Sequence, residues 1–256
     1  MDVSRGEKLK GLLDAWQPGT VATTAWLRRL GVSPQHAHGY VSGRWLEPVA
    51  NGVFKRPSET LTWQGALHSL QSQLDLQVHV GALTALAADG SAHYVRLGRE
   101  VVFLFSKTGV ILPAWFKAYD WPVALRHTQT QFLPPGLGVR DAMMGGFSLR
   151  ASTPERAILE CLHLAPQAVD LVEAYQVLEG LRSLRPALMQ SLLDACASIK
   201  VKRLFLFMAE KAALPVLPHL RTEGLDLGIG DRALVKGGVY VARHRLVLPR
   251  ELADHE

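Results

Sequence analysis

Residues 20–57 carry the signals that most constrain how this chain folds. Thr23 precedes a short apolar repeat that ends at Gly31, and Ser33-Pro34 opens a second one. A Ser or Thr hydroxyl accepts hydrogen bonds from the free amides of a first helical turn, and proline fits the first helical position. Glycine tolerates the left-handed conformation that ends many helices. The segment therefore predicts two short helices joined by a tight turn, the second ending near Gly43.

A hairpin signal follows these helices. Asn51-Gly52 stands between Ala50 and Val53-Phe54, and this dipeptide is typical of a two-residue type I′ turn between antiparallel strands. Pro48 has no amide hydrogen, so it confines the first of the two strands to the edge of a sheet. Helix, turn, helix and β-wing form the layout of a winged helix-turn-helix, and this layout predicts duplex DNA as a partner.

A further amphipathic segment, 5–16, precedes the helix pair. Its apolar residues recur at i, i+3, i+4 and i+7, which predicts a third helix with one apolar stripe. Three helices and a wing would bury a shared apolar set, which comprises Leu9, Leu12, Leu13, Trp16, Trp26, Leu27, Leu30, Val32, Tyr40, Val41 and Trp45.

The composition is that of an ordinary globular protein. The length of 256 residues predicts two or three compact units, and 48% of the residues are hydrophobic. The longest apolar runs are too short to span a bilayer, and residues 1–10 lack the apolar stretch of a secretory leader. Cys161 and Cys196 are isolated, lack metal-site spacing and are typical of reduced core residues. We therefore expect a cytoplasmic protein without a membrane partner.

The net charge of +5 is unevenly distributed. Counting Lys and Arg against Asp and Glu gives +4 for residues 1–57, zero for 58–149, +4 for 150–250 and −3 for the last six residues. Two basic regions favour a polyanionic partner, although many basic proteins bind no nucleic acid.

Proline at position 57 marks a boundary. We therefore predict a DNA-binding domain over 1–58 and a second region over 59–256, with a candidate subdivision near residue 150. The second region mixes helices and strands, which predicts an α+β protein: an N-terminal winged helix-turn-helix followed by a mixed α/β region. The helices are expected over 61–74, 81–88, 154–164, 167–180, 186–197 and 200–212. The strands are expected over 77–80, 93–97, 101–105, 147–150, 233–235, 239–242 and 246–248.

The second helix of the predicted pair offers a face that could read DNA. Gln35, His38 and Ser42 lie opposite its apolar edge, with His36 and Arg44 beside them. Such side chains can hydrogen-bond to base edges in the major groove. Four further cations are expected at phosphates, where contacts fix position without reading sequence; they are Arg28, Arg29, Lys55 and Arg56. The alternative is a solvated helix face on a winged fold that mediates protein contacts.

Enzyme signatures are absent from the sequence. There is no phosphate-binding glycine loop, no nucleophile elbow, no HExxH motif and no Asp-x-Asp pair. His36 and His38 point to different sides of a helix and cannot share a metal ion. His79, His93 and His127 lie in apolar strand contexts, which favours satisfied core or interface residues. We expect no enzyme activity, no cofactor and no metal.

Several segments together resemble the AbiEi-type antitoxins of type IV toxin–antitoxin systems. They are TTAWLRRLGVS and NGVFKRP in the winged region, HVGALTALAADGSAHYVRLG, LPAWF and GGFSLRASTPERAILECL in the middle, and LRPALMQSLLDACASIKVKRLFLFMAE and LDLGIGDRALVKGGVYVARHRLVLP near the end. The resemblance covers most of residues 7–250, and none of the segments is a catalytic motif.

The resemblance implies a bacterial repressor that binds inverted repeats in its own promoter, either as a dimer in solution or as monomers that pair on DNA. It also implies a nucleotidyltransferase-like toxin as functional partner, neutralised by the C-terminal region without a stable complex. Within that region the basic stretch Lys200, Lys202 and Arg203 is the most exposed candidate for the antitoxin activity, and a solvated helix face is its alternative. An interaction module that binds protein or RNA, with no antitoxin role, is the alternative for the whole chain.

Overall fold

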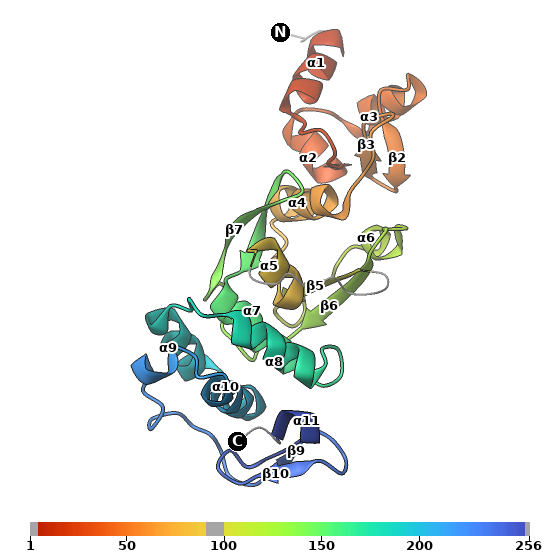
Figure 1. Cartoon of the computed structure of the whole chain (residues 1–256). Helices are drawn as coiled ribbons and strands as arrows, with labels where there is room; N and C mark the ends of the chain where they lie inside the picture. The colour runs from red at the N-terminus through yellow and green to blue at the C-terminus, as the bar shows by residue number, and fades with distance from the viewer. Residues whose placement is uncertain (1–4, 91–99, 254–256) are drawn as a thin grey trace. The chain divides into compact units, whose positions relative to one another are not determined.

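The computed structural model describes residues 5–90 and 100–253 (Figure 1). The strand predicted over 93–97, and His93 with it, lie outside the described residues. The described chain groups into two compact units. The first contains residues 5–78, 110–124 and 143–149, and the second contains 79–90, 100–109, 125–142 and 150–253. The boundary at residue 58 stays a prediction, and the first compact unit continues beyond it to residue 78 and includes two later segments.

The winged module has the predicted order of elements. Its helices and strands are α1 (Arg5–Ala15), β1 (Ala22–Thr23), α2 (Thr24–Arg29), α3 (Pro34–Ser42), β2 (Glu47–Ala50) and β3 (Val53–Lys55). The strands form a sheet in the order β1-β3-β2, which places β2 and its Pro48 at an edge as predicted. The two-residue strand β1 was not predicted from the sequence, because two residues carry no alternating pattern.

The turn of the wing differs from the predicted type. Gly52 has a φ of +72°, but Asn51 does not have the positive φ that a type I′ turn requires at both central residues. A register shift between Pro48 and Ala50 accompanies this turn in β2. The type I′ prediction was therefore wrong, whereas the hairpin itself is confirmed. The Gly145-Gly146 turn, by contrast, has a positive φ at both of its central residues, +56° and +84°.

The core of the winged module buries five residues of the predicted apolar set, which are Leu12, Trp16, Leu27, Val32 and Tyr40, and Leu9, Trp26 and Val41 pack against them partly buried. Ala22, Ala37 and Leu46, which were not in that set, complete the buried cluster. Trp45 and Leu30 are 51% and 40% exposed, so the prediction that they are buried was wrong. Arg44 has a φ of +58°, and this left-handed residue turns the chain after α3 so that Leu46 enters the core in place of Trp45. Leu30 follows the last residue of α2.

Helix α4 (Trp63–Leu74) binds the unpaired edge of β1 through buried polar side chains. Ser69 Oγ accepts from the amide of Val21 and donates to its carbonyl oxygen. Gln73 pairs with the same carbonyl and accepts from the amide of Thr23 at 2.9 Å. These bonds satisfy backbone groups that would otherwise be buried without partners. The short helix α6 (Ala114–Ala118) completes the first unit and was not predicted.

A five-stranded sheet has the strand order β6-β5-β4-β8-β7. Its strands are β4 (Val78–Val80), β5 (Val101–Ser106), β6 (Ala124–Gln129), β7 (Val139–Met144) and β8 (Phe147–Ser152). Strands β4 and β8 pair in parallel, with Val80 opposite Ala151. Strands β4, β5 and β8 lie where the sequence predicts them, whereas β6 and β7 were missed.

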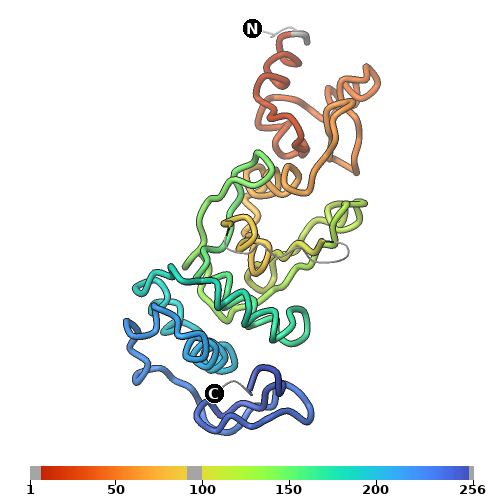
Figure 2. The backbone as a smooth tube through the Cα atoms, in the orientation of Figure 1, coloured from red at the N-terminus to blue at the C-terminus, as the bar shows by residue number. Residues whose placement is uncertain are grey.

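Helices of the second unit pack around one large core (Figures 1 and 2). They are α5 (Ala82–Ala88), α7 (Pro154–Leu164), α8 (Leu171–Gly180), α9 (Pro186–Ala195) and α10 (Ile199–Lys211). Each confirms a predicted helix, with ends that differ by a few residues. Cys161 and Cys196 are buried and form no disulfide within the described residues, as expected for reduced core residues.

The end of the described chain is a small sheet with the strand order β10-β11-β9. Its elements, with the short helices beside it, are η1 (Leu217–His219), β9 (Arg232–Ala233), β10 (Val239–Val241), β11 (Leu246–Leu248) and α11 (Arg250–Ala253). Strand β11 pairs antiparallel with β10 and parallel with β9. The three predicted strands are confirmed.

A buried carboxylate joins several elements of the second unit. Glu160 on α7 is fully buried, and its Oε1 lies 2.8 Å from both His79 Nε2 and Arg156 Nε. Its Oε2 accepts from Ser152 Oγ at 2.8 Å and from the amide of Ala82 at 3.0 Å. Burial alone would raise the pKa of Glu160, but the charges and hydrogen bonds of His79 and Arg156 lower it to about 2.

Candidate nucleic-acid interface

Hydroxyl caps fix where α2 and α3 begin. Thr23 Oγ1 accepts from the amide of Trp26 at 3.2 Å, and Ser33 Oγ accepts from the amide of His36 at 3.2 Å. Pro34 occupies the first position of α3, and Gly31 has a φ of +76°. The sequence signals therefore act as predicted, and they hold α3 at a defined angle after a tight turn.

Helix α3 buries one face and exposes another. Ala37 and Tyr40 are buried in the core of the module, whereas Gln35, His38 and Ser42 are exposed. Ser42 Oγ donates to the carbonyl oxygen of His38 at 3.1 Å, so its hydroxyl oxygen remains able to accept. The three side chains are polar and small enough to enter a groove, and none belongs to a Lys, Arg, Asp or Glu.

His36 is half-buried, unlike the three exposed side chains. Its Nδ1 is buried and has no hydrogen-bond partner among the described residues. The ring therefore lies at the margin of the exposed face.

The segment after α3 presents two large side chains to solvent. Arg44 is exposed in its left-handed conformation, and Trp45 follows it with half of its surface exposed. The Trp45 amide donates to the Tyr40 carbonyl oxygen at 2.8 Å, which ties this segment to the end of α3. The sequence predicts Arg44 as a DNA contact and Trp45 as a core residue. The exposure of Trp45 was missed because a tryptophan beside an apolar repeat carries no sign of exposure.

The last turn of α2 carries Arg28 and Arg29, both exposed. Arg29 Nη2 donates to the carbonyl oxygen of Gln73 at 2.8 Å, so part of its guanidinium is used to bind α4. Arg28 is the better placed of the two to reach an external anion.

Lys55 and Arg56 are engaged within the module. Lys55 Nζ lies 3.0 Å from Glu47 Oε1 and donates to the carbonyl oxygen of Glu59. Arg56 Nη2 donates to the carbonyl oxygens of Leu13 and Trp16, at the end of α1. Both side chains therefore stabilise the winged module, which their positions in the sequence did not reveal.

A groove of about 340 Å³ separates the start of α3 from the wing. Its walls include Pro34, His38 and Val41 on the helix side and Pro48 and Asn51 on the wing side. No Lys or Arg side chain lines it. The groove therefore lacks the charge of a phosphate site, and the cations of the module lie elsewhere on its surface.

The predicted basic patch on α10 is not a surface patch. Lys202 and Arg203 are buried, with 4% and 2% of their surface exposed, and Lys200 is half-buried. Arg203 donates to the carbonyl oxygens of Leu227, Gly228, Gly230 and Arg245. The expectation that this stretch is exposed, as a solvated helix face or as a surface patch, was wrong, because Lys200 and Arg203 bind carbonyl groups distant in sequence. Its antitoxin role stays a prediction.

Two of the histidines that the sequence assigns to the core or an interface, His79 and His127, have side-chain partners, as predicted. His79 binds the buried Glu160, and His127 Nε2 lies 2.8 Å from Ser106 Oγ. Within the residues that the structure describes, no three His, Cys, Asp or Glu side chains gather as a metal site would require. No helix in that part of the chain combines the length and apolar character needed to cross a bilayer.

The capped helix pair, the exposed polar face of α3 and the three-stranded wing sheet define a winged helix-turn-helix protein of the transcription-regulator class. Two family models match almost the whole chain. One, described as "Transcriptional regulator, AbiEi antitoxin N-terminal domain", matches residues 5–97, and the other, described as "Transcriptional regulator, AbiEi antitoxin, Type IV TA system", matches residues 99–249. The chain therefore belongs to the AbiEi antitoxin family of transcriptional regulators, which confirms the resemblance seen in the sequence.

The fold is also similar to a solved structure, the crystal structure of the RV2827C protein from Mycobacterium tuberculosis. The match has a TM-score of 0.61 at 14% identity and covers 98% of this chain and 94% of that one. At this identity the likeness concerns the fold alone. No curated protein sequence matches the chain.

Proposed function

We propose that the protein represses its own operon by placing α3 in the major groove of an inverted-repeat operator. The observation that carries this proposal is the exposed face of Gln35, His38 and Ser42 on a helix that Ser33 caps, beside a wing. Gln and Ser side chains can hydrogen-bond to base edges, and Arg44 can reach guanine. Arg28 and Arg29 are assigned to phosphates, and His36 to the margin of the contact.

Lys55 and Arg56 receive a structural role in this proposal, because their donors bind carboxylate and carbonyl groups of the module itself. With few free cations on the face, one copy would bind weakly, so two copies on the two half-sites would supply the affinity. Monomers that pair on DNA and a dimer formed in solution both satisfy this arrangement.

The second part of the proposal concerns the toxin. We assign the neutralisation of a nucleotidyltransferase-like toxin to the region after the winged module, without a stable complex and without a catalytic step. Family membership as a type IV antitoxin supports this assignment. The buried state of Lys202 and Arg203 removes them from the surfaces that could perform it.

A mobility-shift assay with the DNA upstream of the operon tests the repressor role. We expect a shift that weakens as salt rises, because phosphate contacts release counterions. Arg44→Ala and Gln35→Ala should each cost about 1–3 kcal/mol on the operator and little on unrelated DNA. Arg28→Gln should weaken binding to both DNAs alike.

Lys10→Gln is a matched control for Arg28→Gln, since Lys10 is an exposed cation on α1 that is not among the assigned residues. Equal losses for Arg44→Ala and Arg28→Gln on both DNAs would show that the assigned orientation of α3 is wrong. Absence of any salt-sensitive shift, with co-purification of the neighbouring gene product, would favour the interaction module instead.

A further inference from the structure

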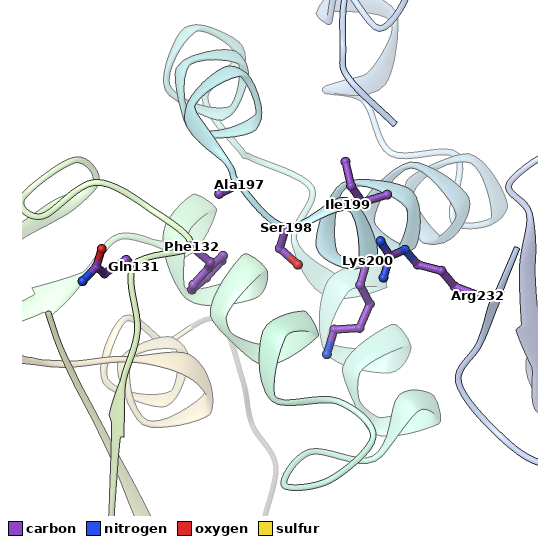
Figure 3. A pocket seen from close by; sticks show the side chains of 7 residues that line it. All are labelled: Gln131, Phe132, Ala197, Ser198, Ile199, Lys200 and Arg232. Atoms are coloured by element: carbon purple, nitrogen blue, oxygen red, sulfur yellow. The ribbon is translucent and has the colours of Figure 1, made fainter. Parts of the chain in front are cut away.

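A cavity of about 500 Å³ opens in the second unit beside the first turn of α10 (Figure 3). Phe132 forms one wall, Ser198, Ile199 and Lys200 form the helix side, and Arg232 of β9 reaches in from the opposite side. The volume lies within the range of small-ligand sites, about 300–1,000 Å³. The cavity is remote in sequence from the winged module and takes no part in the proposed DNA contact.

The charged side chains that line this cavity are all cations. Lys200 and Arg232 line it, and no Asp or Glu does. Lys200 Nζ donates to the carbonyl oxygens of His163 at 2.7 Å and Ala165 at 2.6 Å. An ammonium group has three donors, and these two bonds use two of them. Arg232 is exposed and forms no ion pair with any residue that the structure describes.

Positive charge also exceeds negative charge in the surroundings. Burial, followed by the charges of Arg245 and Arg232, lowers the pKa of Arg203, which lies on the same helix as Lys200. Asp231, the acid next to Arg232 in the chain, pairs with Arg245 at 3.0 Å. The positive end of α10, a helix of 13 residues, adds to the same field. Like charges repel, so an anion would stabilise this arrangement.

The remaining walls indicate what the anion carries. A single phosphate group would occupy only part of 500 Å³. Ile199, with the 6% of the Phe132 surface that is exposed, supplies apolar surface beside the cations. We propose that this cavity binds a mononucleotide, with its phosphate between Lys200 and Arg232 and its nucleoside against Phe132 and Ile199. This site is independent of the proposed function, since neither DNA reading nor toxin neutralisation is needed to form it.

Isothermal titration of the full chain with adenosine monophosphate, uridine monophosphate, adenosine and inorganic phosphate tests the proposal. We expect saturable binding of a monophosphate, weaker binding of inorganic phosphate and none of adenosine. Arg232→Gln should weaken the monophosphate affinity about tenfold or more, because a charge-assisted contact is lost. Arg232 is exposed, so its replacement leaves the core intact.

Lys236→Gln is the matched control, because Lys236 is an exposed cation of the same C-terminal segment that does not line the cavity. Its affinity for the monophosphate should equal that of the wild type. Equal losses in both variants would show general attraction of anions and would overturn the proposal. Absence of saturable binding by either monophosphate, or inorganic phosphate binding as tightly as the nucleotides, would overturn it as well.

Discussion

Replacement of Glu160 by glutamine is expected to destabilise the second unit by about 3–5 kcal/mol at neutral pH. The carboxylate is fully buried and joins α7 to β4, to the start of α5 and to β8 through His79, Ala82 and Ser152. Glutamine has nearly the same shape but no charge, so it leaves Arg156 buried without its anion. Urea unfolding followed by far-UV circular dichroism measures the loss.

The effect of this substitution should depend on pH. The pKa of Glu160 is about 2 in the folded protein, against an ordinary value of 4.5. A folded-state pKa below the unfolded one gives stability that is present above about pH 4.5 and is lost as the pH falls towards 2. The gap between wild type and Glu160→Gln should therefore narrow over this range. Glu223→Gln, a change at an exposed carboxylate, should have little effect. A gap that stays constant from neutral pH to pH 3 would contradict the assigned charge.

Replacement of Arg203 by methionine is expected to release the C-terminal segment from α10 and to cost about 3 kcal/mol. Arg203 is buried and donates to four carbonyl oxygens between Leu227 and Arg245. Methionine keeps the apolar stem but removes every donor. We expect trypsin to cleave the variant faster after Arg232 and Lys236, which limited proteolysis with mass spectrometry would locate.

Two further variants serve as controls for Arg203→Met. Arg203→Lys should recover only part of the stability, since an ammonium group cannot reproduce a planar fork of five donors. Arg243→Met should be nearly neutral, because the Arg243 side chain is 79% exposed and its ion pair with Glu210 is at the surface. Unchanged protease resistance in Arg203→Met would show that the carbonyl contacts do not hold the segment.

The parts of the fold that the sequence predicts correctly rest on local signals. The caps at Thr23 and Ser33 act within one helical turn, and they are where the structure confirms the sequence most closely. Strand β6 was missed because most of its residues, such as Arg126 and His127, are polar or charged and their burial does not alternate along the strand. The wing turn was assigned from its dipeptide alone, although the register shift in β2 decides the geometry.

The candidate site likewise has some features that local sequence signals predict and others that they do not. Exposure of Gln35, His38 and Ser42 follows from helical periodicity, so the sequence predicts it. The roles of Arg56 and Arg203 do not, because their carbonyl partners lie about 20–40 residues away and any residue type can supply a carbonyl oxygen. A basic run in a sequence therefore does not distinguish a surface patch from buried cations that bind the backbone.

We propose that α3 reads DNA and that the region beyond the winged module neutralises the toxin. A variant should therefore be able to lose one activity and keep the other. A reporter fused to the promoter of the operon, measured together with growth during toxin expression, tests this claim most directly. The double variant Gln35→Ala/Arg44→Ala should lose repression and still protect cells from the toxin. Full repression by that variant, or loss of protection in a variant that remains folded, would contradict this division of roles between α3 and the region beyond the winged module.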